Sequence, residues 1–192
     1  MIEPSKLYTT QLQAGLGVVE ETRILLNLYE PGMTTQQLYQ SALDSGAFPM
    51  VSARRLRNVV SECFAPRYIR SESAQYLKKL KDSVSSEAFS QLLLIHTATA
   101  NRVLHDFLSE VYWERYSGGR STISLRDAKD FVENAVREGK TRKVWSDTTI
   151  TRVSSYLLGC CVDFGMVSSR RTAEREILPI RIHSSTVSYL AY

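Results

Sequence analysis

Residues 146–165 have the sequence SDTTITRVSSYLLGCCVDFG, which predicts a capped helix that packs on a core. Ser146 stands at the N-cap position, and Gly165 stands where a left-handed residue commonly ends a helix. Between them, apolar residues recur at steps of three and four and form one inward-facing stripe; they are Ile150, Val153, Leu157, Cys161 and Phe164. We therefore predict a helix over residues 147–164.

This helix belongs to a pattern that occurs twice in the chain. Residues 124–164 form a capped helix at 125–138, a loop and the helix at 147–164. Residues 34–64 repeat the order, with helices at 35–45 and 53–64 that Thr34 and Ser52 cap, and Pro66 is expected to stop the second. Only the second copy is followed by short extended runs, which predict a β-hairpin within 166–182. The pattern resembles two helix-turn-helix units, the C-terminal one winged, although a plain helix pair remains the alternative for each copy.

The remaining segments are also predicted to be helical. The helices are expected at 10–29, 74–81 and 86–116, the last being the central core helix. Gly15 and Gly17 weaken the first helix and are expected to mark close packing of the backbone. The predicted fold is all-α with a small hairpin wing. Its predicted units are an N-terminal one at 1–85 and, at 86–192, the long core helix with the winged unit, together forming one compact body.

Composition is typical of a globular protein from the inside of the cell. Of 192 residues, 43% are hydrophobic and 23% are charged, which is enough apolar material for a core. Cys63, Cys160 and Cys161 have no paired spacing that would indicate disulfides. The N-terminal residues do not read as a signal peptide, and the longest apolar run, at 156–162, is too short to span a bilayer. We expect a cytoplasmic protein with no membrane partner.

Charge is distributed in blocks along the chain. The net charge is +4 and the isoelectric point is near 9.0. Residues 51–81 carry eight Lys or Arg against two Asp or Glu, and residues 139–183 carry eight against four. The segments at 1–50 and 82–138 each have a net charge of −3. Two basic blocks between acidic ones indicate a polyanionic partner, with an uneven but inert surface as the alternative.

Within these blocks the basic and polar residues gather at the starts of the second helices and on the presumed wing. A recognition helix uses its N-terminal turns to reach bases or phosphates, and Arg and Asn pair well with guanine and adenine. The candidate nucleic-acid-binding residues are Arg54, Arg55, Arg57, Asn58, Lys78, Arg142, Lys143, Thr148, Thr149, Arg152, Arg170, Arg171 and Arg175.

Signatures of catalysis or metal binding do not occur in the sequence. The three histidines lack the spacing of zinc ligands, and His96 and His105 are expected on opposite sides of one helix. Gly139-Lys140-Thr141 looks like the end of a phosphate-binding P-loop, but Asn134 occupies the position of its first glycine. We expect no enzyme activity, no cofactor, no metal and no small-molecule substrate.

Several stretches resemble the BrxA family over residues 7–170. They are Leu7-Tyr8-Thr9-Thr10 followed by Gly15, Glu20-Glu21-Thr22-Arg23, Ala53-Arg54-Arg55, Asp106-Phe107-Leu108 and Trp145-Ser146-Asp147-Thr148-Thr149. The resemblance implies a helical bacterial component of the BREX phage-defence systems, with other BREX proteins as partners. It also implies nucleic-acid binding, because the family is associated with winged-helix-like DNA binding and has been likened to the RNA binder NusB. It brings no contact residues with it.

The function predicted from the sequence is non-catalytic binding of double-stranded DNA within such a defence system. RNA binding in the manner of NusB is the first alternative, and it would use aromatic residues such as Tyr112, Trp113 and Tyr116 for stacking, although packing in the core or an interface is the expected role of these three. A scaffold that binds only proteins is the second alternative.

Overall fold

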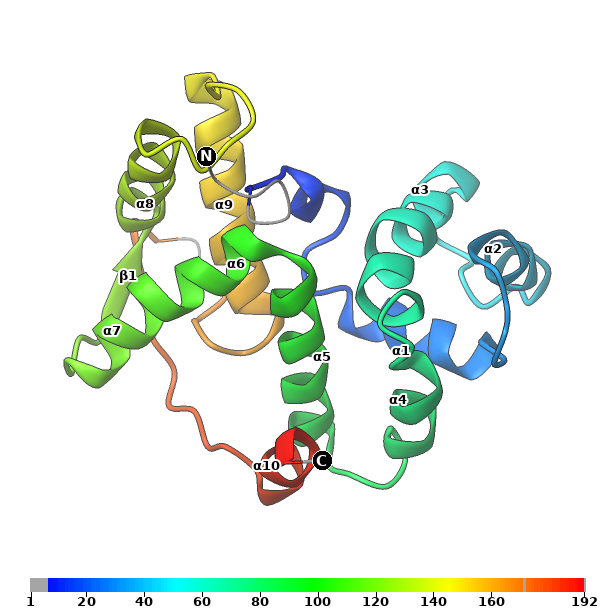
Figure 1. Cartoon of the computed structure of the whole chain (residues 1–192). Helices are drawn as coiled ribbons and strands as arrows, with labels where there is room; N and C mark the ends of the chain where they lie inside the picture. The colour runs from blue at the N-terminus through cyan, green and yellow to red at the C-terminus, as the bar shows by residue number, and fades with distance from the viewer. Residues whose placement is uncertain (1–6, 171, 192) are drawn as a thin grey trace. The chain divides into compact units, whose positions relative to one another are not determined.

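The computed structural model describes residues 7–170 and 172–191, and these residues are mostly helical (Figure 1). They form two compact units. Unit 1 joins the N-terminal segment up to Gly17 with Thr97–Arg181, and unit 2 joins Val18–His96 with Ile182–Tyr192. The predicted units at 1–85 and 86–192 follow the order of the chain, whereas each observed unit combines two separated segments.

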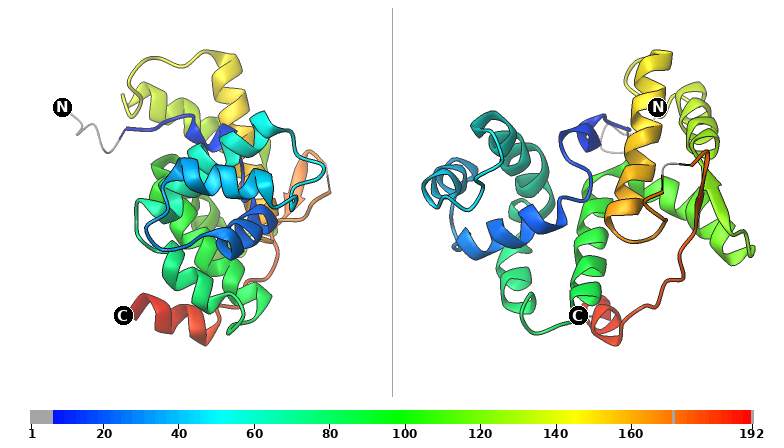
Figure 2. Two further views of the ribbon diagram at one scale, coloured as in Figure 1. Left: turned by 90° about the vertical axis from the view of Figure 1, so that its right-hand side faces the viewer. Right: turned by 180° about the vertical axis from the view of Figure 1, so that it is seen from behind.

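Unit 1 contains a helical layer and a small sheet. Its elements are the 3-10 turn η2 (Gln11–Ala14), α6 (Arg102–Phe107), the π-helical η4 (Leu108–Tyr112), α7 (Trp113–Ser117), β1 (Thr122–Ser124), α8 (Leu125–Arg137), α9 (Asp147–Asp163) and β2 (Glu174–Glu176). Helices α8 and α9 pack against each other, and η2 lies beside α9 (Figures 1 and 2). The inward stripe predicted for α9 is buried at Ile150, Val153, Leu157 and Cys161.

The sheet of unit 1 brings together segments about fifty residues apart. Strands β1 and β2 are antiparallel, with Ile123 opposite Arg175. The predicted hairpin is also present, because Val167 forms an antiparallel bridge with Ile177, and the Ser168 amide donates to the Glu176 carbonyl at 2.9 Å. The prediction of a small antiparallel β element is thus confirmed, but within 166–182 it amounts to this isolated bridge. The regular sheet pairs β2 with strand β1, which runs directly into α8 and which the prediction missed.

Unit 2 is a helical cluster. Its elements are α1 (Val19–Leu28), α2 (Thr35–Asp44), α3 (Ala53–Asn58), the π-helical η3 (Val59–Ile69), α4 (Ala74–Leu80), α5 (Ser86–Ala100), whose last residues belong to unit 1, and α10 (Ser184–Ala191). A row of aromatic rings runs through it at centroid separations of 5.2 to 6.3 Å, in the order Tyr29, Phe64, Tyr68, His96 and Tyr189. Helix α10 is attached to α5 by Gln91, whose amide oxygen accepts from Thr186 Oγ1 at 2.9 Å.

The observed helix starts agree well with the predicted ones, because a capping side chain bonds to a backbone amide only two or three residues away. Thr34 and Ser124 both form complete capping boxes, with Gln37 and Asp127 as the reciprocal partners. Ser52 accepts from the Arg55 amide at 3.2 Å. The helices predicted at 35–45, 74–81, 125–138 and 147–164 are confirmed as α2, α4, α8 and α9.

The single helix predicted at 10–29 is wrong, because the chain is extended between η2 and α1. The Gly17 amide donates to Asp163 Oδ2 at 2.8 Å, and a Cβ at this position would lie 2.6 Å from the Asp163 Cβ. Val18 then adopts a left-handed φ of 43° before α1 begins. Gly17 therefore marks the expected close packing, but this packing replaces the helix instead of occurring within it.

The long helix predicted at 86–116 is broken at Asn101. Its backbone is extended, with φ −129° and ψ 90°, so α5 ends at Ala100 and α6 begins at Arg102. The Asn101 side chain donates to the Thr97 carbonyl at 2.8 Å, which satisfies a group that the next turn would have used.

The predicted stop at Pro66 is also wrong, since α3 continues as η3 as far as Ile69. In this π-helical stretch the Arg70 amide bonds to the Ala65 carbonyl five residues back, at 3.0 Å. The wider turn accommodates a proline, whose ring would meet the carbonyl four residues back in an α-helix.

Candidate nucleic-acid interface

The N-terminal turns of α9 form an exposed polar surface on unit 1. Ser146 caps the helix by accepting from the Thr149 amide at 3.3 Å, and its Oγ lies 3.1 Å from Thr149 Oγ1. Thr149 is consequently half-buried in the cap, whereas Thr148 and Arg152 are exposed. The opposite face of α9 is buried, so these side chains point away from the core.

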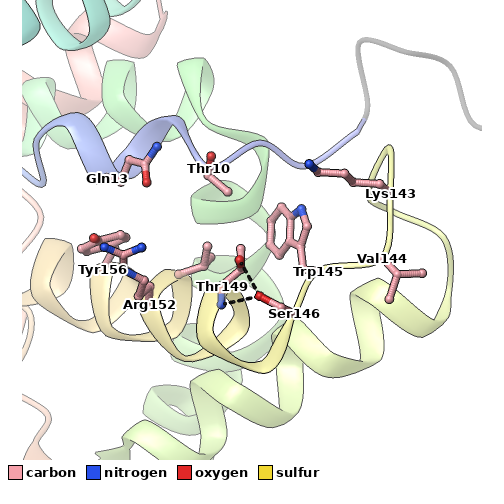
Figure 3. Close-up of a pocket in the computed structure, with 10 residues that line it drawn as sticks. Thr10, Gln13, Lys143, Val144, Trp145, Ser146, Thr149, Arg152 and Tyr156 are labelled. Atoms are coloured by element: carbon pink, nitrogen blue, oxygen red, sulfur yellow. Dashed lines mark hydrogen bonds between the residues drawn. The ribbon is translucent and has the colours of Figure 1, made fainter.

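A groove of about 380 Å³ runs beside this surface (Figure 3). The starts of η2 and α9 line it from two sides, together with the loop that enters α9. The lining residues are Thr10, Gln13, Lys143, Val144, Trp145, Ser146, Thr149, Arg152, Val153 and Tyr156. In Figure 3, Thr10 and Gln13 lie on one wall, and Trp145, Thr149 and Arg152 lie along the other. The groove thus joins a predicted basic cluster to the N-terminal segment.

The N-terminal segment holds the loop that carries Arg142 and Lys143. The Tyr8 amide donates to the Lys140 carbonyl at 2.7 Å, and Tyr8 forms a parallel bridge with Thr141. Thr141 Oγ1 in turn donates to the Lys143 carbonyl at 2.9 Å. Both basic side chains are exposed on a loop whose backbone is fixed at this point.

Tyr8 is itself anchored inside unit 1 by a buried carboxylate. Its hydroxyl donates to Asp106 Oδ2 at 2.8 Å, and Arg102 Nε and His105 Nδ1 both lie 2.9 Å from the same carboxylate. Burial alone would raise the pKa of Asp106, but these hydrogen bonds outweigh it and lower the pKa. Burial and the bond to Asp106 raise the pKa of Tyr8. This cluster fixes the N-terminal wall of the groove.

Two of the residues predicted to lie on a wing, Arg170 and Arg175, are in a different part of unit 1. Arg170 is exposed at the start of the loop between the two hairpin segments. Arg175 is half-buried on β2, and its guanidinium lies 3.5 Å from the Ser168 carbonyl. Arg171 lies outside the described residues.

The other predicted residues belong to unit 2. Arg54, Arg55 and Asn58 are exposed on the first turns of α3. The guanidinium of Arg57 lies 5.1 Å from the centroid of the Tyr39 ring, a cation–π contact that orients it. Lys78 donates to the Tyr29 carbonyl and to the Glu30 carboxylate, each at 2.7 Å, so this side chain also ties α4 to the end of α1.

The structure therefore sorts the candidates into one set for each unit. The unit 1 set is Arg142, Lys143, Thr148, Thr149, Arg152, Arg170 and Arg175, and the unit 2 set is Arg54, Arg55, Arg57, Asn58 and Lys78. The prediction missed the groove residues Thr10, Gln13, Trp145 and Tyr156. A tryptophan two residues after Lys143 and directly before a helix cap was the one local signal of this site.

The aromatic residues considered for RNA stacking are largely packed. Tyr112 is fully buried, and its hydroxyl donates to the Met166 carbonyl at 3.0 Å. Tyr116 is half-buried, and its hydroxyl oxygen accepts from the Ile180 amide at 3.2 Å. Trp113 is 36% exposed and packs edge-on against both. Tyr112 is thus unavailable for stacking, which corrects that part of the RNA alternative.

The described residues were also compared with the requirements of a metal site, a reactive cysteine and a membrane-spanning helix. In residues 7–170 and 172–191, no group of three His, Cys, Asp or Glu could hold a metal ion. The three cysteines are buried and unbridged, and burial raises the pKa of the Cys63 and Cys161 thiols. Across the same described ranges, no helix combines the length and the apolar character that crossing a membrane requires.

Comparison with known proteins places the chain in a family. A model of the BrxA family matches residues 6–192. The BREX protein BrxA of Bacillus cereus (strain H3081.97) is 20% identical over 167 residues, which cover 85% of this chain and 80% of that protein. The crystal structure of an uncharacterized protein from Magnetospirillum magneticum shares the fold, with a TM-score of 0.75 at 18% identity, covering 96% of this chain and 92% of that one. Because the family model spans nearly the whole chain, this protein belongs to the BrxA family.

Proposed function

We propose that this protein is a non-catalytic component of a BREX phage-defence system that binds double-stranded DNA. Membership of the BrxA family and the name of its Bacillus cereus relative support the place in BREX and make other BREX proteins its expected partners. DNA binding is supported by the surface of α9. The two parts of the proposal are tested separately.

The observation that carries the DNA-binding part is the order of elements in unit 1. A helical stretch (α6 to α7), strand β1, helices α8 and α9, and a hairpin succeed one another. This is the order expected of a winged helix, in which the last helix enters the major groove and the hairpin contacts the flanking backbone. In that interpretation α9 is the recognition helix, and Arg170 lies on the wing.

The side chains on these elements suit phosphate better than bases. The exposed cations Arg142, Lys143 and Arg170 lie on the loops before and after α9, whereas its own first turns present Thr148 and Arg152. Lysine and arginine neutralise backbone phosphates, which positions a protein on DNA without reading its sequence. We therefore propose binding with little sequence preference and a strong dependence on salt.

Competition gel shifts with duplex DNA, single-stranded DNA and folded RNA test this function. We expect the labelled duplex to be displaced best by unlabelled duplex of unrelated sequence. Better competition by folded RNA would favour a NusB-like role. No shift with any nucleic acid would leave a protein-binding scaffold.

We also propose that binding needs no metal or cofactor. The reason is that the sequence lacks ligand spacings of the known kinds. Elemental analysis of the purified protein should find no stoichiometric metal, and treatment with a chelator should leave the gel shift unchanged. Zinc bound through Cys160 or Cys161 would contradict this.

A further inference from the structure

We propose that the groove beside α9 binds the sugar–phosphate backbone of one DNA strand and takes two successive phosphates. The inference rests on the proposed function and deepens it by giving the strand a defined place. It also adds Trp145, Thr10 and Gln13 to the binding residues. One of these residues provides a hydrogen-bond donor that faces the groove.

Trp145 is this donor. Its side chain is buried, with 8% of the residue exposed, and it lines the groove. Among the described residues its Nε1–H has no hydrogen-bond acceptor, and Figure 3 shows the nitrogen on the side of the ring nearer Lys143. The indole ring is packed, but its Nε1–H keeps access to water in the groove, and the oxygen of a ligand can replace that water. An N–H directed into a groove is positioned for an acceptor that a ligand supplies, and phosphate oxygens are strong acceptors.

The charges of the groove point to an anion at each end. Lys143 and Arg152 lie at opposite ends in Figure 3, and both side chains are exposed. No Asp or Glu in the described part of the chain pairs with either of them. From Ser146 to Arg152 the helix rises by about 9 Å, so one phosphate group cannot reach both ends of this wall at once. Two cations separated by a neutral floor match a strand in which charged phosphates alternate with neutral sugars.

The size of the groove excludes a whole duplex and fits a short part of one strand. A volume of about 380 Å³ suits a ligand of nucleotide size and is far too small for a duplex. The groove is also lined by Val153 and Tyr156, against which a sugar can pack, and by the polar side chains of Thr10 and Gln13. Figure 3 shows Thr10 between Lys143 and Arg152, and Tyr156 beside Arg152. A recognition helix in the major groove has a backbone strand along its flank, and this groove lies along the flank of α9.

The first test is a salt titration of duplex affinity by fluorescence anisotropy. Lys143→Ala combined with Arg152→Ala should flatten the slope of log affinity against log salt by about 1.8, because each released phosphate contributes about 0.9. Trp145→Phe keeps an aromatic, though smaller, ring and removes the N–H, so it should lower affinity several-fold and leave the slope unchanged. Arg126→Ala is the matched control, since Arg126 is exposed on α8 and does not line the groove. Its slope should equal that of the wild type.

A second test observes the groove directly. The chain has two tryptophans, Trp113 and Trp145, so Trp113→Phe makes Trp145 the only tryptophan. Saturating duplex should shift its emission, and the shift should be lost when Lys143 and Arg152 are both alanine. Lys143 and Arg152 are exposed, so replacing them with alanine should not disturb the packing of the core.

The outcomes separate the two proposals. If the wild type binds duplex, but the double variant keeps its slope and Trp145 emission does not respond, the strand does not lie in the groove and this inference is overturned while the proposed function stands. If the wild type binds no duplex at any salt concentration, both fall.

Discussion

Units 1 and 2 each contain a capped helix pair with arginine in the first turns of the second helix, but they differ in what surrounds that helix. Around α9, the N-terminal segment and the entering loop build a groove, and the same unit contains a two-stranded sheet. Around α3, the arginines are on an open helix surface, and Arg57 rests on a tyrosine of the neighbouring α2. The same local pattern therefore yields a shaped site only where segments distant in sequence come beside it.

The units also differ in how their aromatic rings are arranged. Unit 1 has two separate groups of rings, one with Tyr8, Phe107 and Phe131 and one with Tyr112, Trp113 and Tyr116. Unit 2 has one row of rings, which includes His96. Both tryptophans belong to unit 1, so tryptophan fluorescence reports on that unit while circular dichroism reports on all helices.

The largest effect is expected at Asp106. Asp106→Asn removes the charge that Arg102 and the Tyr8 hydroxyl bind, and hydrogen bonds to charged groups are each worth about 1.5–3 kcal/mol. Unit 1 should be destabilised by about 2–3 kcal/mol on the same scale. Urea denaturation followed by tryptophan fluorescence measures the change. Tyr8→Phe, which removes only one of the bonds, should cost less, and an equal cost would show that the charge itself is unimportant.

Two glycines sharpen this view of unit 1. Gly17→Ala would place a Cβ 2.6 Å from the Asp163 Cβ, near the backbone of α9, and should cost about 2 kcal/mol as overpacking does. Gly159→Ala is the matched control, because its Cβ would meet the flexible end of Leu16 at the same distance. The side chain of Leu16 can move, and Ala favours a helix by up to about 1 kcal/mol, so this variant should be nearly neutral. If urea denaturation shows that both variants are destabilised equally, the distinction between a rigid and a flexible neighbour is wrong.

Salt titrations compare the two basic sets directly. Arg54→Ala with Arg55→Ala alters unit 2, and Arg170→Ala with Arg171→Ala alters the segment that the sequence predicts to be a wing. If DNA contacts both sets, each pair should weaken binding on unrelated duplexes alike and flatten the log–log slope by up to about 1.8. A base-reading role for Arg57 or Asn58 would instead cost about 1–3 kcal/mol on preferred sites only. Unchanged slopes in both double variants would mean that these arginines are only solvated surface.

How far the sequence predicted the molecule depends on how local each feature is. Helices α2, α8 and α9 were predicted because caps such as Thr34, Ser124 and Ser146 act within three residues. Strand β1 was missed because three residues with one apolar side chain, Ile123, carry no pattern until β2 pairs with them. The breaks at Gly17 and Asn101 likewise arise from contacts that local propensity does not contain.

The candidate site follows the same rule. The basic residues of α9 and its loop were identified from their charge and position. The groove was not, because its second wall, Thr10 and Gln13, is more than 120 residues away in the chain from α9. The attachment of Tyr8 to Lys140 and Asp106, and of Gly17 to Asp163 of α9, brings the two walls together.

The smallest expected effect is a loss of stability at mildly acidic pH, which is expected from a residue of unit 2. His96 in unit 2 is half-buried between Tyr68 and Tyr189, with its Nε2 2.8 Å from the Tyr189 hydroxyl oxygen. Burial lowers the pKa of His96, so below the ordinary value of about 6.5 the unfolded chain takes up a proton that the folded chain does not. The stabilisation is therefore fully present above that pH and is lost as the pH falls through the lowered pKa.

The pKa of Asp106 in unit 1 is also lowered, so this group too stabilises the fold less as the pH falls, but it does so at a lower pH than His96. The pKa of Asp106 is lowered from an ordinary value of about 3.9, so its contribution stays constant between pH 7 and 5. His96→Gln keeps a hydrogen-bonding side chain and removes the titration. Urea denaturation followed by circular dichroism at pH 7, 6 and 5 should show a fall in wild-type stability that is shallower in the variant. The same pH dependence in both proteins would mean that His96 is protonated as readily in the folded chain as in the unfolded one.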